Sequence, residues 1–263
     1  MLAVDDGRGG VDTARTTATI SNVAPSLASF SVSTTPRGLA NGTVTVPVSA
    51  TFTDPGTLDT HTATLDCGSG FTAQSYAPDG KASGECSFSS PGVYSIQLTV
   101  RDDDGGSDTR LASGQVVVYD ATAGWVTGGG WIASPIGANA IAPTTTGKLT
   151  FGFVARYQSG SSVPTGNAEF KLNVGKFDFR STSFDWMVVS DGSALLHGRG
   201  TVNGAGDYEF AVIAIDGQAT GAIRIQIWNR VSGAIAYDNR PGESLDDSAV
   251  TPLGGGSIQL HSH

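Results

Sequence analysis

The sequence contains few of the residues that build helices or bind nucleic acid. Of its 263 residues, 15 are Lys or Arg and 24 are Asp or Glu, which gives a formal net charge of −9. Nucleic-acid binding needs a basic surface, so this charge disfavours a nucleic-acid partner. Lysine, glutamate, leucine and methionine are scarce, whereas glycine (36 residues), threonine and serine are abundant. This composition indicates an all-β protein.

Long apolar runs and catalytic motifs are also absent. No apolar run reaches the ~18 residues that a membrane helix needs, so we expect no membrane insertion. The first ten residues, MLAVDDGRGG, lack the apolar centre of a signal peptide. Neither G-x-S-x-G nor H-E-x-x-H occurs, and the adjacent Asp246 and Asp247 show no acid–base spacing. We therefore expect a protein that is not an enzyme.

Alternating apolar and polar residues recur along the chain, as in TVTVPVSATF (Thr43–Phe52) and VYSIQLTV (Val93–Val100), with Gly- and Pro-rich turns between such runs. Short strands at this spacing predict β-sandwiches. A small-residue linker follows at 121–124, and all four tryptophans lie beyond it. We therefore expect one domain at residues 23–120 and a second, Trp-rich β domain at residues 125–263. In the second domain, the GGG runs at Gly128–Gly130 and Gly254–Gly256 predict β-bulges or tight strand packing rather than a phosphate site.

Two stretches of the chain are near copies of each other. VDDGRGGVDTA occupies Val4–Ala14 and VRDDDGGSDTR occupies Val100–Arg110. Only the second copy has a domain's length of β-like sequence before it.

The first domain resembles the PKD-type domains of secreted bacterial proteins. The resemblance is carried by FTDPGTLDTHTATLDCGSG (Phe52–Gly70) and FSSPGVYSIQLTVRDDDGGSDT (Phe88–Thr109), and it extends over about Pro25–Asp120. It implies an Ig-like β-sandwich that acts as a spacer or adhesive module, in an extracellular or cell-surface protein. The second half, from GWVTGGGWIASPIGA onward, resembles the post-COAP-type β domain that follows PKD repeats. That family implies no specific activity.

In such arrays the DDDGG segment lies in the last strand of a repeat. The resemblance therefore implies that residues 1–22 are the orphan last strand and linker of a preceding repeat. A strand without its domain can pair with a sheet edge of another molecule, which would give a homo-oligomer or filament. A tail left by truncation is the alternative.

The sequence departs from the PKD pattern at Cys67, where the family's DWGDG reads DCGSG. The only other cysteine is Cys86, which we expect on a neighbouring strand. We predict a Cys67–Cys86 disulfide, which would close a loop of ~20 residues and contribute roughly 3 kcal/mol. Two buried free thiols are the alternative.

Five carboxylates are candidate calcium ligands: Asp54 and Asp59 in the FTDPG segment, and Asp102, Asp103 and Asp104 in DDDGG. In a PKD-type sandwich these two segments can approach each other, and adjacent carboxylates repel without a cation. A solvated turn without metal is the alternative.

The tryptophans could form a platform for sugar rings. They are Trp125, Trp131, Trp186 and Trp228. Because Trp131 and Trp228 lie in apolar runs, core packing is the favoured interpretation for them. The sequence thus predicts a non-catalytic structural or adhesive segment with other extracellular proteins or polysaccharide as partners; a carbohydrate-binding module on a PKD spacer is the alternative.

Overall fold

The computed structural model describes residues 2–17, 21–39, 42–68, 71–76, 80–190, 192–217, 221–245 and 250–261, without the side chains of residues 2, 4, 11, 12 and 71–76. Strands make up 62% and helices 2% of it, which confirms the all-β, sandwich-like fold. The buried apolar residues form two clusters, one in each half of the chain. In the described part of the chain, no helix is long and apolar enough to cross a membrane.

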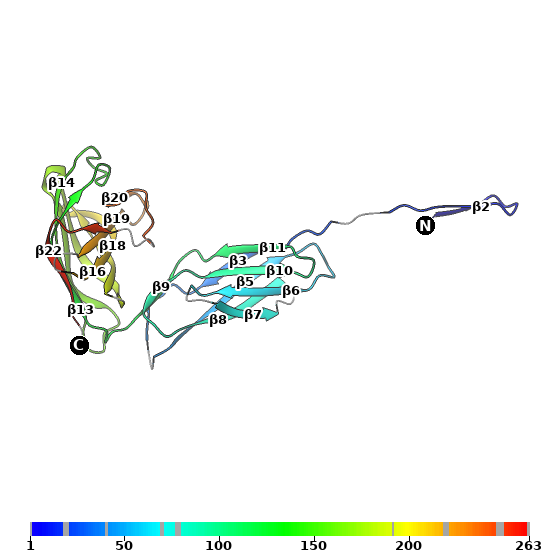
Figure 1. The fold of residues 1–263 in the computed structure, drawn as a ribbon, viewed down its shortest axis with the longest axis horizontal. Helices are drawn as coiled ribbons and strands as arrows, with labels where there is room; N and C mark the ends of the chain where they lie inside the picture. The colour runs from blue at the N-terminus through cyan, green and yellow to red at the C-terminus, as the bar shows by residue number, and fades with distance from the viewer. Residues whose placement is uncertain are drawn as a thin grey trace.

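The first domain packs two sheets face to face (Figure 1). Its strand β5 (Val44–Thr53) alternates buried and exposed residues throughout, so Val46, Val48 and Phe52 all point into the core. One sheet has the order β3 (Ser26–Val32), β5, β8 (Lys81–Phe88), and the other β11 (Ser107–Leu111), β10 (Gln97–Asp102), β6 (His61–Asp66), β7 (Phe71–Tyr76). A third, small sheet has the order β4 (Arg37–Gly38), β12 (Val116–Tyr119), β9 (Gly92–Tyr94).

The disulfide between Cys67 and Cys86 is present, with an S–S distance of 2.04 Å and a Cα–Cα distance of 5.7 Å. Cys67 directly follows β6 and Cys86 lies on β8, so the bond joins the two sheets across the core. The expectation of neighbouring strands was therefore wrong. Both cysteines are buried in the first domain's core.

The second domain is built on one antiparallel sheet that folds back on itself. Rings from strands that are not neighbours in the sheet meet inside it: Phe170 lies 6.4 Å from Phe210, and Phe177 lies 5.2 Å from Tyr237. Among the described residues the strand order is β20 (Ile235–Asp238), β19 (Ala222–Asn229), β18 (Ala205–Ile215), β17 (Ser193–Val202), β16 (Phe177–Ser190), β15 (Pro164–Leu172), β14 (Gly147–Tyr157), β13 (Trp125–Ser134), β22 (Gly255–His261), with β21 (Thr251–Pro252) against β19. A short 3-10 helix, Asn173–Gly175, connects β15 to β16.

The two glycine runs allow close strand packing in this sheet. Gly130 pairs with Gly256 between β13 and β22, and a side chain on either residue would collide with the opposite backbone. The ring of Trp131 lies against Gly254 and Gly255. Tight packing, one of the two expectations from the sequence, therefore accounts for the glycines of both runs except Gly129, where a Cβ would meet no other atom within 4 Å.

Strand β12 belongs to both cores. Val116 and Val118 lie in the first domain's cluster, whereas Val117 and Tyr119 lie in the second domain's cluster. The Tyr119 ring stacks on Tyr157 of β14, with 4.9 Å between the ring centroids and 14° between the planes. The junction between the domains is therefore a packed, apolar contact.

The N-terminal segment is a hairpin and not the single strand expected from the sequence. Strand β1 (Leu2–Asp5) pairs antiparallel with β2 (Val11–Ala14). The related segment in the first domain forms the β10–β11 hairpin and is followed by β12, so it does not end the domain. In both hairpins the acidic Gly-rich stretch forms the turn, because Asp and Gly favour tight turns.

We predict that the double substitution Cys67→Ala/Cys86→Ala lowers the free energy of unfolding of the first domain by about 3 kcal/mol, because the unfolded chain gains the entropy of the opened loop. Urea denaturation of the two proteins measures this difference. Denaturing the wild-type chain in a reducing agent is the control, and equal stability of oxidised and reduced protein would contradict the prediction.

Candidate functional site

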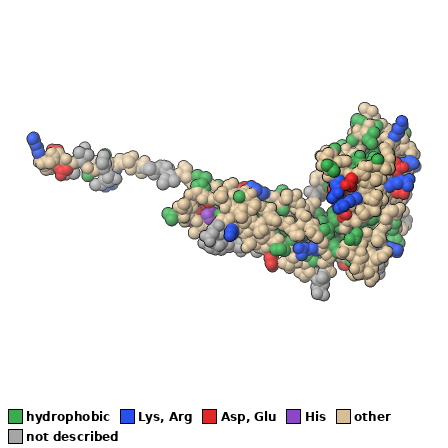
Figure 2. Space-filling view, turned by 180° about the vertical axis from the view of Figure 1, so that it is seen from behind, with side chains coloured by type: hydrophobic (Ala, Val, Ile, Leu, Met, Phe, Trp, Pro, Cys, Tyr) green, Lys and Arg blue, Asp and Glu red, His purple; other side chains and the backbone are tan. Residues whose placement is uncertain are grey.

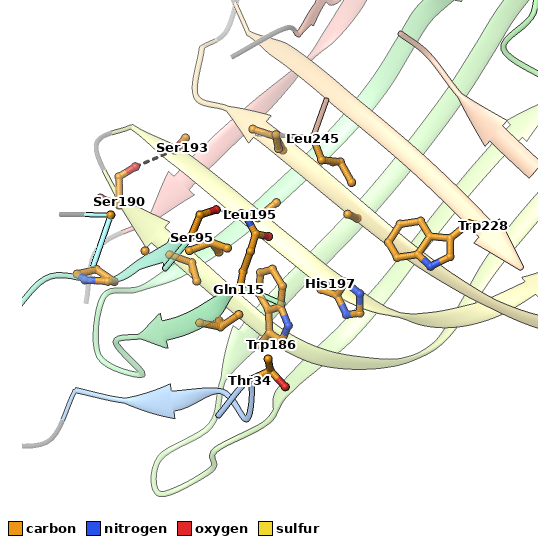
Figure 3. A pocket seen from close by; sticks show the side chains of 18 residues that line it. Thr34, Ser95, Gln115, Trp186, Ser190, Ser193, Leu195, His197, Trp228 and Leu245 are labelled. Carbon is orange, nitrogen blue, oxygen red and sulfur yellow. Dashed lines mark hydrogen bonds between the residues drawn. The ribbon is translucent and has the colours of Figure 1, made fainter. Parts of the chain in front are cut away.

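A cleft lies where the two domains meet, and it encloses about 760 Å³ (Figure 3). From the first domain, Thr34, Ser95 and Gln115 line it, with Val93 of β9 and Val117 of β12. Like β12, β9 contributes to both cores, through Tyr94 to the first and Val93 to the second. From the second domain, the outer faces of β16, β17, β18 and β19 line it. A second hollow of about 640 Å³ shares Thr34, Trp186 and His197 with the first, so the two are continuous.

Three rings lie side by side on the second domain's wall of this cleft. Trp186 and His197 are register partners on β16 and β17, with 5.1 Å between their ring centroids and 9° between their planes. Trp228 on β19 lies 5.7 Å from His197 on the other side, as Figure 3 shows. The order across the sheet is therefore Trp186, His197, Trp228.

Strand alternation explains why these side chains point outward. On β17 every second residue from Ala194 is buried, which leaves His197 and Arg199 on the outer face. On β19 the residues Ile223, Ile225 and Ile227 fill the core, so Trp228 faces outward. The same two-residue period thus supplies both the core and the cleft wall.

Hydrogen bonds and ion pairs hold the polar groups around the rings. His197 Nδ1 lies 3.1 Å from Asp185 Oδ2, and the Arg199 guanidinium lies 3.6 Å from Asp185 Oδ1. The Trp228 indole N–H donates to Glu209 at 3.0 Å, and Arg230 pairs with Glu209 at 3.4 Å. Each charged side chain at this wall therefore has a partner of opposite charge.

Burial lowers the pKa of His197, although the nearby Asp185 and Glu209 carboxylates partly oppose the shift. The imidazole is therefore neutral at neutral pH. Asp185 accepts a hydrogen bond from Nδ1–H in this state, which leaves Nε2 as the hydrogen-bond acceptor of the ring.

A buried ion pair supports the far wall of the cleft. Arg224 points to the outer face of β19, yet it is completely buried, because the segment after β20 covers it. Its guanidinium pairs with Asp238, and it donates to the Glu243 carbonyl at 3.1 Å. This anchors the segment that carries Leu245 to the cleft. Removing one partner of such a pair leaves a buried charge and is strongly destabilising.

The tryptophans do not behave as the sequence suggested. All four are partly exposed, so the expectation that Trp131 and Trp228 pack in the core was wrong. They also do not form one platform: Trp125 stacks on His261 at 3.7 Å, and Trp131 receives the Lys148 ammonium 4.7 Å above its ring. The two junction hollows include only Trp186 and Trp228. Sequence reasoning missed His197, Asp185 and Glu209 as neighbours of these rings.

The acidic residues come together in part. Among the described residues, ligand atoms of Asp54, Asp59 and Asp102 all lie within 4.8 Å of one another, so the FTDPG and DDDGG segments meet as expected. Asp103 is not one of these three residues; its carboxylate accepts the Thr60 N–H at 2.9 Å and so holds the two segments together. Asp104 also lies outside the group.

Calcium needs six to eight oxygen ligands, and this cluster supplies them only in part. Both Asp54 oxygens already bond to the protein, to the Gly56 N–H and to His61 Nε2. Both Asp102 oxygens accept hydrogen bonds, from the Gly106 N–H and from Asn22. Asn22 is the main cause of the lowered pKa of Asp102, whereas desolvation and then the neighbouring carboxylates raise the pKa of Asp59. Calcium binding here remains a prediction.

The surface of the second domain carries paired charges. Figure 2 shows basic and acidic side chains together on this domain, and Arg180 lies 3.4 Å from Asp178 and 3.7 Å from Glu169. These side chains are exposed, so each pair contributes little to stability.

Comparison of the chain with models of known protein families, with curated proteins and with solved structures finds no match. The function must therefore be argued from the site itself.

We predict that Asp59→Asn raises the midpoint of thermal unfolding in the presence of a chelator, because it removes one of three converging negative charges. Asp104→Asn makes the same charge change outside the group and should have a smaller effect. Scanning calorimetry measures both, and a lower midpoint for Asp59→Asn would contradict the prediction. A calcium-dependent rise that the substitution abolishes would establish the cluster as a calcium site.

We predict that protonation of His197 weakens the fold in mild acid. Its pKa in the folded state lies below the ordinary value of about 6.5, so the unfolded chain binds the proton more readily. The stability that depends on neutral His197 is present above about pH 6.5 and is lost as the pH falls toward the lowered pKa. The stability difference between wild type and His197→Asn, measured by urea denaturation, should therefore shrink from about pH 7.5 to about pH 5.5. A constant difference would contradict this prediction.

Proposed function

We propose that the chain is a non-catalytic structural and adhesive segment of an extracellular bacterial surface protein, in which PKD-type sandwiches are joined end to end. The observation that carries this proposal is the repeated hairpin. In β1–β2 the Asp6 N–H bonds to the Gly10 carbonyl at 3.0 Å, and in β10–β11 the Asp102 N–H bonds to the Gly106 carbonyl at 3.0 Å. Asp6 and Asp102 also accept the N–H groups of Gly10 and Gly106.

Two copies of one hairpin support an array of similar modules. In the first domain, β10 pairs along its whole length with β6, and β11 contributes Asp108, which accepts the Leu27 N–H of the opposite sheet. The β10–β11 hairpin is thus an integral part of a sandwich. By analogy, β1–β2 is the corresponding part of another sandwich.

The packed junction and the disulfide support the same proposal. A spacer transmits its length only if its domains keep a fixed arrangement, and Tyr119 with Val117 provides an apolar contact for that purpose. A disulfide persists in an oxidising compartment, which fits an extracellular location.

A second candidate function is self-assembly through the N-terminal hairpin. Within the described residues, β1 pairs with β2 and with no other strand, whereas the corresponding β10 lies between two partners. The open edge of β1 can therefore add to a sheet edge of another copy of the chain. Because donor and acceptor differ, such contacts build a filament unless the rotation closes a ring.

Light scattering of the purified chain, with and without residues 1–22, tests assembly. The assembly proposal predicts a mass that rises with protein concentration and returns to that of a monomer after deletion of the hairpin, because the open edge is lost. Each protein is measured in calcium and in chelator, since Asn22 donates a hydrogen bond to Asp102, a member of the acidic cluster. A monomer in all four conditions would contradict assembly.

A separate experiment tests the spacing role. Small-angle scattering of the monomer should fit a single extended arrangement of the two domains. A profile that requires many interdomain orientations would contradict it.

A further inference from the structure

The cleft between the domains has a composition that the spacing role does not require. Its second-domain wall carries Trp186 and Trp228, and the adjoining hollow adds the charged groups of Asp185, Arg199 and Glu209. Apolar residues of both domains also line it, among them Val93 and Ile213. A contact made only to fix two domains would close over these groups. We propose that this cleft binds a neutral oligosaccharide, whose sugar rings pack on Trp186 and Trp228.

The size and shape of the site fit a chain of several sugar units. The larger hollow, at about 760 Å³, lies in the range of small-molecule sites, and the adjoining hollow of about 640 Å³ extends it past Thr34 and Trp186. Trp186 and His197 line both hollows, and Trp228 lines the larger one. A linear ligand can occupy both hollows, whereas one small molecule would fill only part of them.

The rings offer the surface that a sugar needs. A pyranose has an apolar face of C–H groups and a rim of hydroxyls, so it packs on an aromatic ring while its hydroxyls bond to polar neighbours. Trp186 and Trp228 are partly exposed on either side of His197. Each indole therefore combines apolar contact area with access from the cleft.

The polar groups are arranged to bond with hydroxyls. The guanidinium of Arg199 is a donor, the carboxylates of Asp185 and Glu209 are acceptors, and a sugar hydroxyl can be either. Glu209 is held by Trp228 and Arg230, and Asp185 by His197 and Arg199. Side chains fixed in this way lose little entropy when a ligand binds.

The charges favour a neutral ligand over an acidic one. Arg199 faces Asp185, and Arg230 faces Glu209 and Asp207, so both of these cations, in the part of the wall that the structure describes, are paired with carboxylates. Burial also keeps His197 neutral. A uronate or phosphate would therefore meet carboxylates without a positive charge in excess.

Both domains are needed to form the site. Thr34, Gln115 and Val117 of the first domain face the ring-bearing wall across the cleft. The proposal goes beyond the spacing function and does not depend on the N-terminal hairpin. A negative result in light scattering would therefore contradict assembly without bearing on glycan binding, and the reverse also holds.

The test uses the full chain and defined probes: linear hexasaccharides of glucose, mannose and galactose, with a galacturonate hexasaccharide as the acidic comparator. Binding is followed by tryptophan fluorescence and isothermal titration calorimetry. We expect at least one neutral hexasaccharide to bind with a Kd between roughly 10 µM and 1 mM. Absence of binding by all three neutral probes at about 5 mM, or binding of the galacturonate alone, would overturn the proposal.

Matched variants locate the site. Trp228→Ala should weaken binding at least about tenfold, whereas Trp131→Ala, which removes the same side chain outside the cleft, should leave the Kd within about twofold. Thr34→Trp narrows the cleft from the first domain without removing a core residue and should also weaken binding. Thermal unfolding of each variant shows that it is folded. Unchanged binding in both Trp228→Ala and Thr34→Trp would overturn the proposal.

Discussion

Burial of β12 on both of its faces holds the two domains in one arrangement. In an ordinary sandwich strand, alternate residues face solvent, but here Val116 and Val118 enter one core while Val117 and Tyr119 enter the other. Its neighbour β9 repeats the pattern, since Tyr94 packs on the first core and Val93 on the second. Full burial of a side chain of this size is worth about 1.5–3 kcal/mol. Separating the domains would expose these residues, so the junction is part of the fold.

The cleft is a consequence of this junction. Val93 and Val117 form part of its lining, and its walls belong to different domains. Since the shared strands fix the distance between the walls, the cleft has its shape before any ligand arrives. A ligand then needs no domain closure, which reduces the cost of binding. The buried Arg224–Asp238 pair likewise fixes the position of the segment that bears Leu245, another residue that lines the cleft.

Local patterns predicted those parts of the structure that depend on neighbours along the chain. The alternation in Thr43–Phe52 gave a strand with one buried face, and the pair of cysteines gave the disulfide. The resemblance predicted that the segments of Asp54, Asp59 and Asp102 approach each other, and in the structure these three residues lie close together. The prediction that the two cysteines lie on neighbouring strands was wrong, because spacing along the chain does not say in which sheet of a sandwich each strand lies.

The cleft depends on contacts that local patterns do not contain. Trp228 follows three inward isoleucines at alternate positions, so counting the period from Ile227 would have placed it outside the core. The alternation of inward and outward residues along the strand therefore predicts the burial of Trp228 better than the apolar residues next to it in the sequence. His197 lies between Trp186 and Trp228 only through the register of β16, β17, β18 and β19, which no single strand specifies. The burial of Val117 and Tyr119 likewise depends on the second domain, which the sequence of β12 does not contain.

The direction of the chain through the first domain connects the fold to the proposed spacing role. The segment that leads in from the hairpin reaches the turn of β10–β11, where Asn22 donates to Asp102. The chain leaves by β12, at the opposite end of the sandwich, where Tyr119 contacts the second domain (Figure 1). A module entered at one end and left at the other adds its full length to an array. The same geometry places the cleft for which we propose glycan binding at the exit junction, away from the end at which the N-terminal hairpin enters.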